Sequence, residues 1–239
     1  MTFLKKINDK ILIKIEISNP SKCPYLEDKI ETKMFINLSE FPEKNDQLAK
    51  SGFRRVENFA YKPICQDCNA CIPMRVIPKE FIFTRSQNRC LKKNVKLNRK
   101  ISPCIAKEKH YKLFMHYQNF RHQNGQMSKM NWKDYSSMIN LSPIHSIILE
   151  YINDLEELIG IMILDIQKDG LSAVYSFYHS SYSKNSIGLY MILDSINYTK
   201  ELKLKYLYLG YLIKENPKMS YKNNFKEAEI LVNGEWLRL

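Results

Sequence analysis

Two apolar runs joined by a tight turn set the architecture of the second half of the chain: Leu158-Ile-Gly-Ile-Met-Ile-Leu-Asp165, then Lys168-Asp-Gly170, then Leu171-Ser-Ala-Val-Tyr-Ser-Phe-Tyr178. Apolar and aromatic runs separated by an Asp-Gly turn are typical of neighbouring strands in a hairpin. A third such run precedes them at residues 147–152. The three runs therefore predict an antiparallel meander.

The segment after the meander predicts a helix and one more strand. Apolar residues recur there at three- and four-residue spacing, as on one face of a helix: Leu189, Ile192, Leu193 and Ile196. The run Tyr206-Leu-Tyr-Leu-Gly-Tyr-Leu-Ile213 is apolar almost throughout, as expected of a strand buried on both faces. We therefore expect an α+β protein with a GNAT-like acyltransferase domain, a mixed sheet with flanking helices that opens a V-shaped gap between two central strands. Fold alone does not fix the chemistry.

The earlier part of the chain predicts a second, smaller unit. A length of 239 residues is enough for two small cores, and we expect a cysteine-rich α+β domain at residues 1–100 and the GNAT-like domain at residues 101–239. Strands are expected at residues 11–18 and 53–61, with a short helix between them that ends at Gly52. The second domain should begin with a helix at residues 107–122.

Three cysteines recur at every third residue in Tyr61-Lys-Pro-Ile-Cys65-Gln-Asp-Cys68-Asn-Ala-Cys71-Ile-Pro-Met-Arg75. Cysteines this close do not readily bridge one another, because a disulfide constrains both the Cα separation and the Cβ directions. Their thiolates are suited to one soft metal, so the site is a candidate for zinc or an iron-sulfur cluster. Cys23, in Cys23-Pro-Tyr-Leu26, is the best-framed fourth ligand. The alternative is a set of free, partly buried thiols in a reducing compartment.

The chain is strongly basic. It has 37 Lys and Arg against 25 Asp and Glu, a formal net charge of +12, which favours a polyanionic partner such as nucleic acid. Many of the cations fall in one stretch: Arg85, Arg89, Lys92, Lys93, Lys96, Arg99 and Lys100. This stretch is either a track for phosphates or an ordinary solvated face.

The start of the chain carries charges that interrupt any apolar run, in Met1-Thr-Phe-Leu-Lys-Lys-Ile-Asn-Asp-Lys10. We therefore expect neither a secretory signal nor a membrane-spanning helix. The expected location is the cytoplasm, where structural disulfides are rare.

Eight short motifs, taken in order, resemble one family, the bacterial aspartate/glutamate leucyltransferases, which belong with the arginyltransferases among the aminoacyl-tRNA-protein transferases. The matching pieces span nearly the whole chain: Cys23-Pro-Tyr-Leu; Gly52-Phe-Arg-Arg; Tyr61-Lys-Pro-x-Cys-x-x-Cys-x-Ala-Cys-x-Pro-x-Arg75; Arg85-Ser-Gln-x-Arg89; Tyr117-x-x-x-Arg-His122; Asp169-Gly-Leu-Ser-Ala-Val-Tyr175; Tyr208-Leu-Gly-Tyr211; and Lys218-Met-Ser-Tyr-Lys222 with Phe225 and Trp236.

The resemblance implies an enzyme that transfers leucine from leucyl-tRNA to the α-amine of proteins beginning with Asp or Glu, which marks them for degradation by the N-degron pathway. The physical chemistry is consistent with this. The donor is an activated ester, and an α-amine has a pKa of about 7.7–8.0, so positioning can supply much of the rate. No cofactor is required for this chemistry.

Candidate residues follow from the motifs and from what the reaction needs. For binding tRNA phosphates or the acceptor carboxylate they are Arg75, Arg85, Arg89, Arg121, His122, Lys218 and Lys222. Arginine is the better carboxylate partner because it binds bidentately, and Arg75 and then Arg121 are the preferred partners of the acceptor. For orienting the amine or stabilising the oxyanion the candidates are Tyr175, Tyr178, Tyr208 and Tyr211. Buried core tyrosines with satisfied hydroxyls are the alternative, and a helix cap or surface group is the alternative for His122.

Two positions depart from the family pattern. His179 and Ser180 follow Phe-Tyr, where the family usually has Asp, and Leu212 replaces an expected Trp. The rival functions are arginyl transfer to the same acceptors, a coenzyme A-dependent N-acetyltransferase, and a non-catalytic zinc module that binds nucleic acid. The acetyltransferase should have a Gly-rich pyrophosphate turn, whereas residues 182–190 contain one glycine. We expect a monomer.

Overall fold

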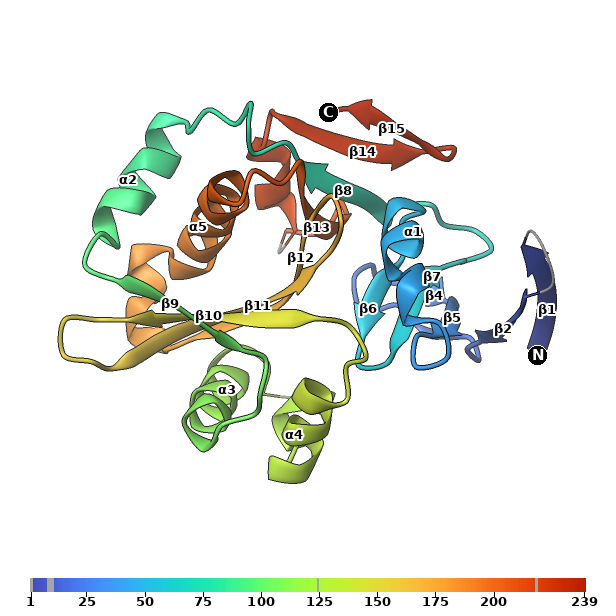
Figure 1. The fold of residues 1–239 in the computed structure, drawn as a ribbon, viewed down its shortest axis with the longest axis horizontal. Coiled ribbons are helices and arrows are strands. Elements are labelled where there is room, and N and C mark those ends of the chain that lie inside the picture. The colour runs from blue at the N-terminus through green and yellow to red at the C-terminus, as the bar shows by residue number, and fades with distance from the viewer. Residues whose placement is uncertain (1, 8–10, 124, 218) are drawn as a thin grey trace.

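Two β-sheets of unequal size form the framework of the protein (Figure 1). The computed structural model describes residues 2–7, 11–123, 125–217 and 219–239. The smaller sheet contains, in spatial order, β1 (Thr2–Ile7), β2 (Ile11–Ile17), β5 (Lys33–Asn37), β7 (Phe59–Pro63) and β6 (Arg54–Val56). The larger sheet contains β15 (Glu235–Arg238), β14 (Ala228–Val232), β8 (Ile72–Val76), β13 (Tyr206–Leu212), β12 (Gly170–Tyr178), β11 (Leu158–Ile166), β10 (Ser146–Ile152) and β9 (Asn98–Pro103). A short pair, β3 (Ser21–Lys22) and β4 (Ile30–Glu31), lies between β2 and β5 in the chain.

Strands β10, β11 and β12 form the predicted antiparallel meander, and the α+β class is confirmed. The β12–β13 pair is the parallel pair among the described strands, and its register covers only Gly170 to Ser172 against Tyr206 to Tyr208. The close approach of the two strands requires glycine at position 170, because a Cβ atom there would lie 2.2 Å from the carbonyl oxygen of Tyr206. Beyond Ser172 the two strands are no longer paired.

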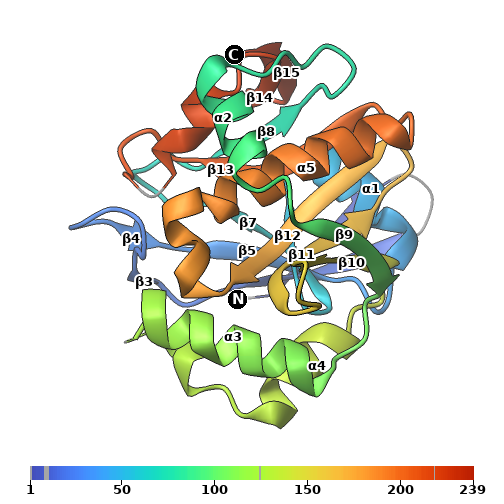
Figure 2. The ribbon, with the colours of Figure 1, turned by 90° about the vertical axis from the view of Figure 1, so that its left-hand side faces the viewer.

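Helices cover both faces of the larger sheet (Figures 1 and 2). Helices α2 (Arg85–Lys93) and α5 (Ile187–Glu201) lie on one face, and α3 (Glu108–Arg121) and α4 (Trp132–Asn140) lie on the other. Capping boxes at Thr84 and Asn131 begin α2 and α4. The main core contains aromatic and aliphatic side chains from the sheet and from both helix layers, including Phe114, Tyr135, Leu149 and Phe177. The remaining helical segments are α1 (Asn45–Lys50), η1 (Pro42–Lys44), η2 (Gln126–Lys129), η3 (Ser180–Asn185) and η4 (Ser220–Asn224).

The expected single strand at residues 53–61 is a hairpin instead. Strands β6 and β7 pair antiparallel, and Glu57 lies between them with a φ of 51°. Because the sequence there has no Asn-Gly or Asp-Gly pair, the usual signal for a tight hairpin is missing. The turn brings Arg54 and Arg55 to the edge of the smaller sheet that faces the larger one.

The larger sheet contains strands from distant parts of the chain. Strand β8, from the first hundred residues, lies between β13 and β14. Strand β9 is the edge strand at the end of the sheet opposite β15. The domain boundary after residue 100 stays a prediction. No helix within the described residues has the length and apolar character needed to cross a membrane.

Candidate active site

The site is built where β12 and β13 separate. Their unpaired carbonyl groups accept hydrogen bonds from two cationic side chains, as buried backbone oxygens require. Arg54 Nη2 donates to the carbonyl oxygen of Ala173 on β12, at 2.8 Å. Lys222 Nζ donates to the carbonyl oxygens of Leu209 and Tyr211 on β13, at 2.8 and 2.6 Å. The gap between the strands is therefore lined by two basic side chains.

Gly210 allows Arg54 to reach this position. It has a φ of +74°, and a Cβ atom at this residue would lie 1.3 Å from Arg54 Nη1. The pairing of β13 with β8 is interrupted between Tyr208 and Gly210, which bends the strand at this point. Glycine is required here by both the backbone conformation and the space that the guanidinium occupies.

A pocket of about 690 Å³, here called the central pocket, opens over the gap. Its polar lining includes Arg54, Tyr175, Tyr211, Tyr221 and Lys222. Its apolar wall contains Met127, Met138, Ile139, Met162 and Ile163. The pocket thus combines two basic side chains with a surface suited to an aliphatic side chain.

A second pocket of about 800 Å³, here called the helix-end pocket, lies beside the start of α5. It is lined by Tyr117, Arg121, His122, Tyr178, Ser186 and Gly188, among others. The two pockets share Tyr25, Tyr117, Ser176, Ile192, Met219 and Tyr221. Because they share these residues, the two pockets adjoin each other.

Burial controls the ionisation of the central pocket. Burial, and then the neighbouring Arg54 guanidinium, lowers the pKa of Lys222 to about 7. Burial also raises the pKa of Tyr221 to about 12 and raises the pKa values of Tyr175 and Tyr211. The tyrosine hydroxyls therefore keep their protons at neutral pH and act as donors.

Comparison with known proteins identifies the family. The family model for the C terminus of arginine-tRNA-protein transferase matches residues 109–232, and the model for the N terminus matches residues 21–89. The aspartate/glutamate leucyltransferase of Hyphomonas neptunium is 39% identical over 94% of this chain and 91% of its own length. The chain belongs to the aspartate/glutamate leucyltransferase family. The leucyltransferases of Ruegeria pomeroyi and Rhizobium meliloti are each 40% identical, over 92% and 93% of this chain and 82% and 90% of their own. A solved structure, L-PGS from Bacillus licheniformis, is 9% identical with a TM-score of 0.42 and covers 59% of this chain and 45% of that one, too little to support an argument.

The four predicted tyrosines of this leucyltransferase do not lie together. Tyr175 and Tyr211 line the central pocket, and Tyr178 lines the helix-end pocket. Tyr208 lines neither pocket, because its hydroxyl faces Arg75 and Asp169, at 3.3 Å from Arg75 Nη1 and Asp169 Oδ2. In the central pocket, the Tyr175 hydroxyl accepts a hydrogen bond from Gln118 at 2.7 Å, which leaves its proton available for a substrate.

Arg75, the first residue predicted to bind the acceptor carboxylate, is held away from both pockets. Its Nη2 lies 2.7 Å from Glu229 Oε2, and its guanidinium lies 3.5 Å from the ring centre of Tyr206 and 4.1 Å from that of Trp236. The side chain is buried. The geometry therefore favours a structural role for Arg75, which fastens β14 and β15 to the rest of the larger sheet.

The predicted phosphate-binding residues fall in two places. Arg85 and Arg89 are exposed on α2, together with Lys92 and Lys93. Arg99 points elsewhere and pairs with Asp194 and Glu201. Arg121 and His122 line the helix-end pocket. Lys218 lies outside the described residues.

Helix α2 is connected to the helix-end pocket by direct contacts. Asn94, at the C-terminal end of α2, donates from Nδ2 to the carbonyl oxygen of Asn185 at 2.9 Å. Cys90 Sγ lies 3.5 Å from the carbonyl oxygen of Ser186, which lines that pocket. The buried side of α2 is thus anchored beside a residue that lines this pocket.

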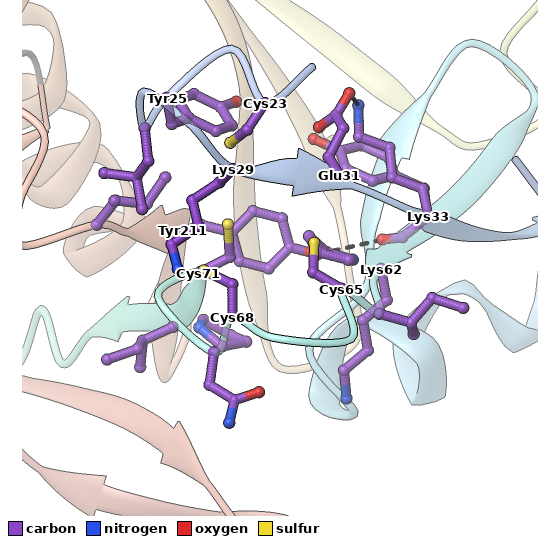
Figure 3. A pocket seen from close by; sticks show the side chains of 18 of the residues that line it. Cys23, Tyr25, Lys29, Glu31, Lys33, Lys62, Cys65, Cys68, Cys71 and Tyr211 are labelled. Atoms are coloured by element: carbon purple, nitrogen blue, oxygen red, sulfur yellow. Dashed lines mark hydrogen bonds and ion pairs between the residues drawn. The ribbon is translucent and has the colours of Figure 1, made fainter. Parts of the chain in front are cut away.

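The four predicted cysteines line one pocket of about 440 Å³ (Figure 3). Burial, and then the neighbouring Cys23, Cys65 and Cys68, raises the pKa of Cys71 to about 12. Within the described part of the chain, no three His, Cys, Asp or Glu side chains are placed so that they could hold one metal ion. The thiols in their present positions therefore do not fit a single bound ion, and metal binding stays a prediction.

The sequence motifs do not assign a role to Arg54. The residue belongs to Gly52-Phe-Arg-Arg, which contributes only to the family resemblance. Its position depends on the turn after β6 and on Gly210, which is more than 150 residues away in the chain. A glycine within an otherwise apolar strand is the one sequence signal that points to a close approach there.

Proposed function

We propose that this protein transfers leucine from leucyl-tRNA to the α-amine of proteins whose first residue is Asp or Glu, and so marks them for degradation. The observation that carries this proposal is the identity of 39–40% with aspartate/glutamate leucyltransferases along more than nine tenths of the chain. The two adjoining pockets are suited to a reaction between two large substrates.

The tRNA end enters the helix-end pocket. Support comes from the exposed cations of α2, because the C-terminal end of this helix contacts Asn185, which precedes the pocket residue Ser186. Arg121 within the pocket supplies a further cation, at an exposed position. Clustered Lys and Arg bind phosphates through release of counterions, which is suited to a tRNA acceptor stem.

The acceptor N-terminus enters the central pocket, where Arg54 binds its Asp or Glu carboxylate. A carboxylate taken out of water requires a charged or hydrogen-bonded partner, and Arg54 retains N–H donors beyond the one used by Ala173. The role that the sequence assigned first to Arg75 and then to Arg121 passes to Arg54, because Arg54 lines the pocket beside the strand gap.

The leucyl side chain packs against the methionine and isoleucine wall of the central pocket. Methionine adapts its shape to aliphatic groups. An arginyl group in the same place would be repelled by the Arg54 charge, so arginyl transfer is not favoured. The Tyr175 hydroxyl, whose proton is not used by Gln118, donates toward the carbonyl oxygen as charge develops there.

The GNAT-like assignment is part of this proposal. The short parallel pairing of β12 and β13, followed by their separation, supports it, because a V-shaped gap between two central strands is expected of such a fold. The monomeric state is likewise an expectation from the sequence.

The donor is tested with two charged tRNAs. The protein is incubated with an Asp-headed peptide and either leucyl-tRNA or arginyl-tRNA, and the product is identified by mass spectrometry. Transfer from leucyl-tRNA alone, or at a rate well above that from arginyl-tRNA, supports the proposal. Efficient arginyl transfer without leucyl transfer would overturn it.

A further inference from the structure

Lys222 is a buried lysine that has no acidic partner among the described residues. Its exposed fraction is 5%, and no Asp or Glu in the described part of the chain forms an ion pair with it. The charged group that perturbs the pKa of Lys222 is another cation, Arg54. A permanently charged ammonium is costly in such a place.

The hydrogen bonds of Lys222 match a neutral amine. Its Nζ atom has two acceptors, the carbonyl oxygens of Leu209 and Tyr211, at 2.8 and 2.6 Å. A neutral amine has two N–H groups, so these two acceptors use both of them and leave the lone pair. Because Lys222 lines the central pocket, that lone pair is available to a group bound there.

We propose that Lys222 is the catalytic base that takes a proton from the α-ammonium of the acceptor in the central pocket. The inference rests on the proposed function, since it places the acceptor N-terminus beside Arg54. The separated strands that create the gap also hold the base, because its two acceptor carbonyls are the ones that β13 leaves unpaired.

The proton balance is complete. The neutral Lys222 amine accepts one proton from the acceptor ammonium, and the resulting amine attacks the ester carbonyl carbon of the leucyl group. A C–N bond forms and the C–O bond to the ribose breaks. The second amine proton ends on the departing ribose oxygen, and Lys222 then releases its own proton to water.

Other groups at the site are less suited to this step. The pKa values of Tyr175, Tyr211 and Tyr221 are raised by burial, so these hydroxyls do not accept protons. An arginine such as Arg54 stays protonated in proteins. A base near pKa 7, the value of Lys222, is closely matched to an α-amine of about 7.7–8.0.

The experiment compares the pH dependence of leucyl transfer in the wild type and three variants, at saturating leucyl-tRNA and Asp-headed peptide. Lys222→Gln keeps N–H donors but is not a base, and Lys222→Arg keeps a cation but cannot deprotonate. Lys226→Gln, which removes an exposed cation from the same segment, is the matched control. Thermal melts confirm that each protein is folded.

We expect both Lys222 variants to have a kcat about 100-fold or more below that of the wild type at pH 7, the usual effect of removing a general base. The deficit should shrink as the pH rises above the pKa of the acceptor amine, because the amine is then neutral without help. A peptide whose α-amine is replaced by an aminooxy group, which is neutral at pH 7, should also be used almost as well by Lys222→Gln as by the wild type.

Three outcomes would overturn the inference. Full activity of Lys222→Arg would show that Lys222 acts as a cation, and an equal deficit at every pH and with both peptides would show a structural role. If the variants do not fold, nitrogen NMR of the wild-type lysine side chains decides, and titration of Lys222 near its ordinary value would reject the base. Absence of leucyl transfer by the wild type would instead reject the proposed function.

Discussion

Arg55 on β6 and Asp165 on β11 form an ion pair with two hydrogen bonds that joins the two sheets. Arg55 Nε lies 2.6 Å from Asp165 Oδ2, and Arg55 Nη2 lies 2.7 Å from Oδ1. The two side chains are 5% and 1% exposed, and Ser146 Oγ also donates to Asp165 at 2.6 Å. The pair fixes β6 against the larger sheet and so positions the adjacent Arg54 in the strand gap.

Breaking this pair should destabilise the protein strongly. We expect Arg55→Gln to lower the free energy of unfolding by about 3–5 kcal/mol, since it leaves the buried Asp165 carboxylate unpaired. Urea denaturation measures the change. The exposed pair Arg238–Glu80 provides the control, because Arg238→Gln breaks a solvent-screened ion pair and should change stability far less. Equal effects in the two variants would contradict the role of Arg55.

Arg54 should control selectivity for acidic acceptors. Arg54→Gln removes a charged hydrogen bond to the acceptor carboxylate, an interaction of about 1.5–3 kcal/mol. The Michaelis constant for an Asp-headed peptide should therefore rise about 10- to 150-fold, while that for leucyl-tRNA stays the same. Steady-state kinetics with each substrate varied in turn makes this measurement.

Gly210→Ala and Arg75→Gln serve as the matched comparisons. Gly210→Ala should reproduce the selectivity defect, because its Cβ atom displaces the Arg54 guanidinium. Arg75→Gln should lower stability but keep the ratio of Asp-headed to Ala-headed products. A changed product ratio in the Arg75 variant, with an unchanged ratio in the Arg54 variant, would show that Arg75 binds the acceptor carboxylate.

The exposed cations around the end of α2 should bind tRNA. Charge reversal at Lys92, Lys93 and Lys96 should weaken tRNA binding. The slope of the logarithm of the binding constant against the logarithm of the salt concentration should become less steep, by about 0.7–0.9 for each phosphate that the variant no longer neutralises. Filter binding over a range of salt concentrations gives both values. An unchanged affinity and slope would remove this helix from the tRNA interface.

The cysteine pocket makes a prediction about metal content. If Cys23, Cys65, Cys68 and Cys71 bind zinc or an iron-sulfur cluster, their side chains must adopt an arrangement other than the one in this structure. Metal analysis of protein purified without oxygen should then find metal in the wild type and much less in Cys71→Ser. Cys104→Ser is the control, since Cys104 lines the central pocket instead. Metal-free wild-type protein with full activity would leave free thiols as the interpretation.

Much of the fold could be predicted from local patterns. The meander at residues 147–178 and the helix after it follow from apolar periodicity and the turn at Gly170, which are properties of neighbouring residues. The hairpin at residues 54–63 was missed because its turn uses Glu57 in a left-handed conformation, an uncommon choice for a residue with a side chain.

The site was less predictable because its contacts are distant in the chain. The sequence predicted Tyr175 and Tyr211 on the two strands that line the gap, and both line the central pocket. It did not show that Glu229 and three aromatic rings surround Arg75, since that cage forms only when the last two strands join the sheet. The sequence did not predict a role for Arg54 for the same reason, because the position of its guanidinium depends on Gly210, which is distant in the chain.

The most direct test of the account is a competition between acceptors for a limiting amount of leucyl-tRNA. Equal amounts of otherwise identical peptides beginning with Asp, Glu and Ala are mixed with the wild-type protein, and the leucylated products are counted by mass spectrometry. We expect leucine on the Asp and Glu peptides and little on the Ala peptide. Equal leucylation of all three peptides, or leucylation of the Ala peptide alone, would contradict it.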